Sequence, residues 1–182
     1  MIYLVGISDH NKQHNGNDCA DLFLRNKFSA FLKDKIKEYG IALLAEEFNE
    51  DCLKNSKGNI ATVRSVAEEL KTKGIKLEHI FCEMSESERK RRGILSPSEI
   101  WSKKLDIKSY QGSSPNLNEN QKNIFDKEIE KSFLARETFW FEKISDYFDR
   151  NILFVCGLDH VESFLLLLNS RHHKVKVLCD NS

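Results

Sequence analysis

Residues 151–160 read NILFVCGLDH, and residues 1–10, MIYLVGISDH, repeat the pattern of an apolar run, a glycine, a short spacer and Asp-His. A glycine at the end of a strand lets the backbone turn sharply and approach a ligand. The histidine that follows then lies where the next helix begins. We therefore interpret both stretches as strand ends that contribute His10 and His160 to one site.

Outward from these two stretches, short apolar runs alternate with amphipathic ones, which is typical of βαβ units and a parallel sheet. We expect strands at 2–5, 41–45, 77–82, 152–156 and 175–178, and helices at 18–39, 60–74, 97–105, 119–150 and 159–169. The pattern predicts an α/β fold with a mainly parallel sheet of about five strands flanked by helices. One long helix precedes the fourth strand.

The alternation fails at residues 83–118. We interpret the chain as a single α/β domain, 1–182, with an irregular, insertion-like segment there. Within it, Ser96, Pro97 and Glu99 have the spacing of a capping box with proline at the first helical position, which predicts a short helix through Trp101.

Composition excludes several classes of protein. Lys+Arg and Asp+Glu are both 28, so the net charge is zero, and general binding to nucleic acid or to a membrane surface has no electrostatic support. The apolar start of the chain is too short for a membrane span, and no basic stretch precedes it. The five cysteines are scattered and form no CxxC motif, which favours reduced thiols and a cytoplasmic location.

The carboxyl ends of parallel strands are where α/β proteins bind ligands. Glu46 and Glu47 follow the second predicted strand and join His10 and His160 there. Two imidazoles and a carboxylate are ligands that zinc, manganese or iron accepts. Side chains alternate across a strand, so one glutamate faces the cleft while the other points away, and we favour Glu46. The hypothesis is a divalent metal bound by His10, Glu46 and His160.

Each of these residues also has a structural explanation. His10 lies in a polar run typical of a surface loop, and Asp159 with Glu162 has the spacing of a helix N-cap. Glu137 falls on the apolar face of the long helix, beside Phe133 and Trp140, where an unpaired carboxylate is costly. It is either a site residue or one half of a structural ion pair.

Two further residues are candidates for contacting a substrate. Gln13 follows the first strand, and Arg64 lies at the start of a helix, where anions bind. Helix capping is the alternative explanation for the region around Arg64.

The chain resembles the superfamily that includes TraB-type and TIKI-type proteins, ChaN-like haem-binding proteins and erythromycin-esterase-like hydrolases. Residues 157–160, GLDH, match the late Gly-x-x-His of the TraB and TIKI branches, and residues 6–10, GISDH, resemble the early one with an extra residue. Glu46 and Glu47 resemble the acidic end of the second strand, and Arg136 with Glu137 resembles the helical element. The TIKI branch implies metal-dependent hydrolysis, whereas other branches bind ligands without cleaving them.

The resulting hypothesis is a metal-dependent hydrolase of a small-molecule or peptide substrate. Glu47 or Glu137 would accept a proton, and Arg136 would hold an anionic substrate or stabilise developing charge. One alternative is a module that binds a small molecule, nucleotide or haem without turnover. Another is an interaction protein of a stress or defence system whose Trp101 segment docks a partner protein.

Overall fold

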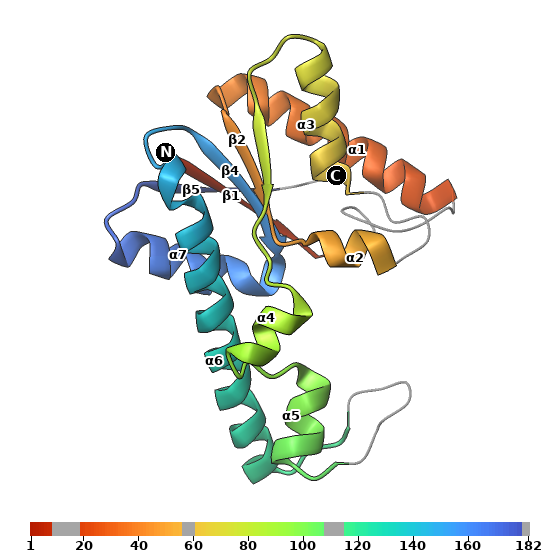
Figure 1. The fold of residues 1–182 in the computed structure, drawn as a ribbon, viewed down its shortest axis with the longest axis vertical. Helices are drawn as coiled ribbons and strands as arrows, with labels where there is room; N and C mark the ends of the chain where they lie inside the picture. The colour runs from red at the N-terminus through yellow and green to blue at the C-terminus, as the bar shows by residue number, and fades with distance from the viewer. Residues whose placement is uncertain (9–18, 56–60, 108–114, 180–182) are drawn as a thin grey trace.

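The computed structural model of this chain describes residues 1–8, 19–55, 61–107 and 115–179. Its centre is a five-stranded, entirely parallel sheet in the order β3-β2-β4-β1-β5 (Figure 1). The predicted α/β fold is thereby confirmed. The strands are β1 (Ile2–Ile7), β2 (Leu43–Glu46), β3 (Glu78–Phe81), β4 (Ile152–Gly157) and β5 (Val175–Leu178).

Helices cover both faces of the sheet. The helices α1 (Cys19–Tyr39) and α3 (Thr62–Thr72) pack on one face, and α6 (Glu119–Ile144) and α7 (Val161–Ser170) on the other (Figure 1). Successive strand residues belong to different layers: Leu44 packs in the α1–α3 core, whereas Leu43 and Ala45 pack in the α6–α7 core. One step along a strand therefore changes the helical layer that a side chain faces.

The segment expected to be irregular contains two short helices, α4 (Glu86–Arg91) and α5 (Pro97–Lys104). They lie beside the part of α6 that extends away from the sheet (Figure 1). The capping box of Ser96 and Glu99 is confirmed, with both of its hydrogen bonds formed. Trp101 is half-buried and stacks on Phe125 of α6, with 5.9 Å between ring centroids, so it contributes to packing between α5 and α6.

The remaining elements are α2 (Glu50–Asn55) and two 3₁₀ turns, η2 (Ser145–Tyr147) and η3 (Leu158–His160). The predicted cap at Asp159 is wrong, because neither η3 nor α7 has a side-chain hydrogen bond at its N-cap. The chain instead passes from β4 through η3 directly into α7, and His160 occupies the N-cap position of α7. In the part of the chain that the structure describes, no helix has both the length and the apolar content needed to cross a bilayer.

The two glycine-ended strands lie side by side. β1 pairs with β4 along its whole length, with Gly6 opposite Cys156 and Ile7 opposite Gly157. Both strands therefore deliver their carboxyl ends to one place, as their shared pattern predicts. Asp9 and His10 themselves lie outside the described residues.

Gly6 is required here because β1 touches the start of α7. A Cβ at this position would lie 2.5 Å from Val161 Cγ2 and 2.9 Å from Leu158 Cδ1. We expect Gly6→Ala to lower the free energy of unfolding by about 1–3 kcal/mol, because the added methyl group overpacks this contact. Adding Val161→Ala should recover part of the loss, measured by urea unfolding, whereas additive losses would contradict the proposed clash.

Candidate functional site

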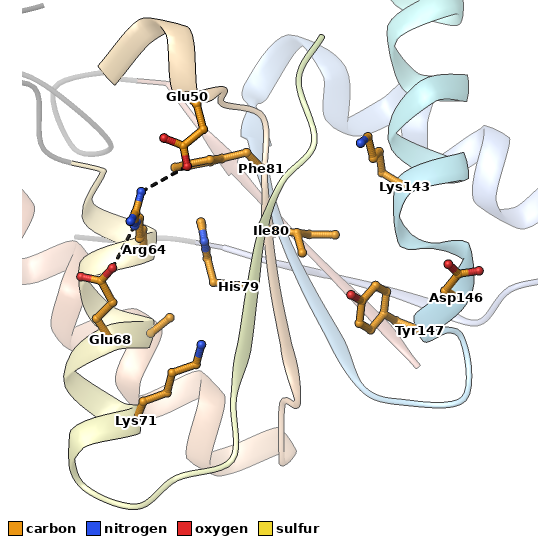
Figure 2. Close-up of a pocket in the computed structure, with 11 residues that line it drawn as sticks. Glu50, Arg64, Glu68, Lys71, His79, Ile80, Phe81, Lys143, Asp146 and Tyr147 are labelled. Atoms are coloured by element: carbon orange, nitrogen blue, oxygen red, sulfur yellow. Dashed lines mark hydrogen bonds and ion pairs between the residues drawn. The ribbon is translucent and has the colours of Figure 1, made fainter. Parts of the chain in front are cut away.

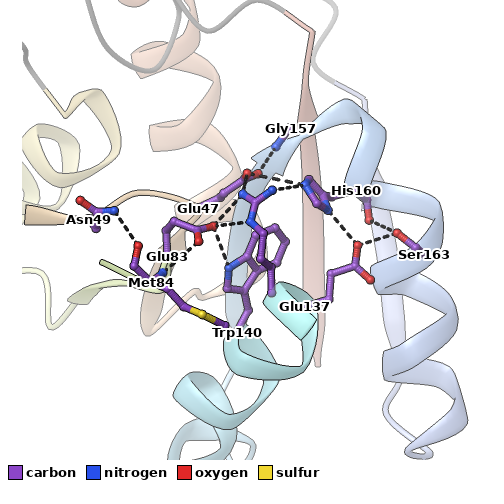
Figure 3. A network of polar contacts seen from close by, with 10 residues as sticks. Glu47, Asn49, Glu83, Met84, Glu137, Trp140, Gly157, His160 and Ser163 are labelled. Atoms are coloured by element: carbon purple, nitrogen blue, oxygen red, sulfur yellow. Dashed lines mark hydrogen bonds and ion pairs between the residues drawn. The ribbon is translucent and has the colours of Figure 1, made fainter. Parts of the chain in front are cut away.

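His160 is the centre of a polar cluster at the carboxyl edge of the sheet (Figure 3). Its Nε2 lies 2.9 Å from Arg136 Nη1, and its Nδ1 lies 2.8 Å from Glu137 Oε1. A guanidinium only donates hydrogen bonds, so Nε2 must accept and therefore carries a lone pair. The ring proton is then on Nδ1 and is donated to Glu137. The hydrogen bonds thus assign a neutral imidazole in a single tautomer.

Glu137 holds the imidazole from a buried position on α6. Its side chain is 1% exposed, and Ser163 Oγ on α7 donates a second hydrogen bond of 2.6 Å to the same Oε1. The imidazole packs against Phe133, with ring centroids 3.8 Å apart, and meets the edge of Trp140 at 4.8 Å. Packing and hydrogen bonding together fix the orientation of His160, which is itself only 4% exposed.

Arg136 connects His160 to two carboxylates from other strand ends. Its Nε and Nη2 donate to Glu83 Oε2 at 3.0 and 2.7 Å, and Nη2 also donates to Glu47 Oε1. Glu47 Oε2 in turn accepts a hydrogen bond of 2.7 Å from the backbone N–H of Gly157. Burial opposes the charge of Arg136, but Glu47 and Glu83 outweigh that effect and raise its pKa. The guanidinium therefore remains charged.

Glu46 and Glu47 separate to opposite faces of the sheet. Glu47 faces α6 and joins Arg136, whereas Glu46, one residue earlier, is fully buried and bonded through Oε1 to His79 Nε2 at 2.7 Å. Our preference for Glu46 in the cleft is thus corrected in favour of Glu47. The reason is the alternation of β2, whose Leu44 already faces the α1–α3 core.

The structure brings together four of the predicted residues, Glu47, Arg136, Glu137 and His160, and adds Glu83 and Ser163. Glu83 directly follows the third predicted strand, so the strand-end rule could have identified it. Ser163 had no comparable signal in the sequence. Arg64 lies elsewhere, on α3, paired with Glu68 at 2.8 Å. Gln13, like His10, is outside the described residues.

The described residues do not fit a metal ion. Within the described ranges, no group of three or more His, Cys, Asp or Glu side chains is arranged to hold one. The lone pair of His160 Nε2 accepts a hydrogen bond from Arg136 Nη1, and a guanidinium in that position would repel a cation. A metal site that uses His160 therefore stays a prediction that depends on His10.

Cys156 lies directly before this site on β4, but its chemistry is different. Burial raises the pKa of its thiol well above the ordinary value, and the nearby charges of Glu47 and Glu137 raise it further. The nucleophilic form of cysteine is the thiolate. Cys156 is therefore a packing residue at neutral pH.

We compared the chain with models of protein families, with curated proteins and with solved structures, and none of them matches it. The resemblance to the TraB, TIKI and esterase-like superfamily thus remains a prediction from short motifs.

Arg136 compensates two carboxylates that would otherwise repel each other. We expect Arg136→Met to lower the free energy of unfolding at neutral pH by about 2–4 kcal/mol, because it leaves Glu47 and Glu83 facing each other without a cation. Adding Glu83→Gln should recover part of that loss in urea unfolding. The control is Arg91→Met on α4: the Arg91 side chain is 74% exposed, so solvent screens its pair with Glu88 and the substitution should leave the free energy of unfolding almost unchanged. Equal losses from Arg91→Met and Arg136→Met would contradict this account.

Elemental analysis tests the metal hypothesis. Because the charged guanidinium of Arg136 lies 2.9 Å from His160 Nε2 and repels a cation, we expect purified wild-type protein and His160→Ala to contain the same, substoichiometric amounts of zinc, manganese and iron. Stoichiometric metal in the wild type that is lost in both His160→Ala and His10→Ala would overturn this expectation and restore the metal site.

Proposed function

We propose that this chain is a hydrolase in which His160 is the general base, Glu137 orients it and a water molecule is the nucleophile. The observation that carries the proposal is the fixed tautomer of His160, whose Nδ1–H is donated to the buried carboxylate of Glu137 while its Nε2 lone pair accepts a hydrogen bond from Arg136 Nη1. The imidazole ring itself needs no reorientation before it accepts a proton, once a water molecule has taken the place of Arg136 Nη1 beside Nε2.

In the proposed reaction, His160 Nε2 takes a proton from water as the water oxygen attacks a carbonyl carbon of the substrate. The imidazolium that forms is stabilised by the negative charge of Glu137, 2.8 Å away. His160 then returns the proton to the leaving alkoxide or amine as the carbonyl re-forms. The water must take the place of Arg136 Nη1 beside Nε2, and the bonds of Arg136 to Glu83 and Glu47 keep its guanidinium nearby.

Arg136 is suited to stabilise the negative charge that develops on the carbonyl oxygen. Its hydrogen bonds with described residues engage Nε–H, both hydrogens of Nη2 and one hydrogen of Nη1. A guanidinium has five N–H donors, so the second hydrogen of Nη1 is left for a ligand oxygen. It lies next to the base, where an oxyanion of the intermediate would form.

The charges of the site favour a neutral or cationic substrate. Glu47, Glu83 and Glu137 carry three negative charges, and Arg136 supplies a single positive charge beside the neutral His160. An anionic substrate would be repelled by this excess of carboxylate. Of the two roles expected for Arg136, this favours the stabilisation of developing charge over the binding of an anionic substrate, and we propose carboxylic esters or amides as the substrate class.

The motif resemblance supports the choice of site residues rather than the proposed chemistry, because the TIKI branch implies a metal that this proposal does not use. The positions that resemble the TraB, TIKI and esterase-like superfamily include His160, Glu47, Arg136 and Glu137, and these side chains form one continuous hydrogen-bonded cluster.

A panel of ester, amide and phosphoester substrates tests the proposal. We expect turnover of neutral p-nitrophenyl esters and of a choline ester, without turnover of p-nitrophenyl phosphate. His160→Ala and Glu137→Gln should each lower kcat by about a hundredfold or more, because the base is lost or its tautomer is no longer fixed.

The matched control is His172→Asn. His172 lies in the turn before β5 with a φ of 64°, a conformation that asparagine also tolerates, so activity and melting temperature should be unchanged. Full activity of folded His160→Ala, or cleavage of the phosphoester alone, would contradict the proposed function.

A further inference from the structure

A groove lies along the outer edge of β3, on the far side of β2 from β4 (Figure 2). It encloses about 650 Å³. One wall comes from α3, with Arg64 and Lys71, and the other from the end of α6 and η2, with Lys143 and Tyr147. The strand itself forms the floor between these walls.

The backbone at this edge has unused hydrogen-bonding groups. Glu78 and Cys82 donate their N–H groups to Ala42 and Glu46, so they face β2, and the alternation of a strand turns His79 and Phe81 the other way. The N–H and C=O groups of His79 and Phe81 thus point into the groove. Among the residues that the structure describes, none bonds to them. A row of such groups is a template for an added strand.

The walls decide what kind of strand fits. Because α3 and the α6–η2 corner both border the floor, β3 is recessed between them (Figure 2). A second copy of the chain would bring its own α3 and α6 against these walls before two β3 edges came within the roughly 4.8 Å of paired strands. A single extended peptide has no such walls and can lie on the floor.

The two walls differ in chemistry. On the α3 wall, Arg64 is neutralised by Glu68 and Glu50, whereas exposed Lys71 has no carboxylate within ion-pair distance in the described ranges. On the opposite side, the groove presents the apolar side chain of Ile80 from its floor and the ring of Tyr147 from its wall, where Lys143 and Asp146 add opposite charges. An acidic side chain therefore suits the α3 wall, and an apolar side chain suits the opposite side.

We propose that the β3 groove binds an extended segment of a partner protein by strand addition, and that acidic and apolar residues alternate in this segment. The acidic side chains point to Lys71 and the apolar ones to Ile80 and Tyr147, because successive side chains of a strand face opposite sides. The backbone of the segment pairs with His79 and Phe81. This binding site is separate from the proposed hydrolytic site and does not depend on it.

Fluorescence anisotropy with the full chain tests the proposal, using a labelled, capped octapeptide of alternating glutamate and valine as the probe. We expect it to bind at least about tenfold more tightly than the lysine–valine peptide. Lys71→Glu should reverse this preference. Lys37→Glu, an exposed change on α1 outside the groove, should leave it unchanged.

N-methylated peptides distinguish strand addition from simple charge attraction. In a strand, the N–H groups that face one neighbour belong to alternate residues. Methylation of either all glutamate or all valine amides should therefore weaken binding about tenfold, since about two hydrogen bonds are lost, while methylation of the other set is tolerated.

Equal effects of the two methylated sets, equal binding of the acidic and basic peptides, or no binding of either peptide would overturn the proposal. A concentration-dependent dimer in sedimentation that Lys71→Glu disrupts would instead assign the groove to a second copy and would also overturn it.

Discussion

The carboxylate of Glu137 is buried in the apolar layer between α6 and α7, and the arrangement of the site follows from the need to pair it. A buried charge is tolerated only where hydrogen-bonding partners replace water, and here Ser163 and His160 do so. Pairing with Glu137 places the imidazole proton of His160 on Nδ1. The other ring nitrogen, Nε2, then has a lone pair that can accept a hydrogen bond, and Arg136 donates one to it.

Arg136 extends this pairing to the rest of the sheet edge. Its contacts join residues that follow β2 and β3 to the start of α7, so three separate strand–helix units meet at one guanidinium. The same contacts neutralise the guanidinium charge, which changes its chemistry. An arginine that is paired with two carboxylates is a directional donor beside a base, and it has no spare charge to attract an anion.

The alternation of side chains on β2 separates two polar sites in this small protein. Glu47 faces the α6–α7 layer and belongs to the His160 cluster, whereas Glu46 faces α3 and holds His79 beside the β3 groove. The buried apolar residues of the sheet separate the His160 cluster from the residues beside the β3 groove. Chemistry at the carboxyl edge and recognition at the edge of β3 can therefore proceed without sharing side chains.

The sequence by itself determined the α/β class, the five strands and the long helix, because hydrophobic periodicity records which local structure buries apolar side chains. It also predicted that the ends of β1 and β4 meet, through their shared glycine pattern, and that Glu137 occupies an apolar helix face. It could not choose between Glu46 and Glu47, since that choice depends on which layer packs against each face of β2. It gave no sign of Ser163, and it did not reveal that Glu83 and Glu47 share Arg136. Those contacts join elements far apart in the chain, so only the tertiary packing of α6, α7 and the sheet, which sets the distances between charged groups, decided them.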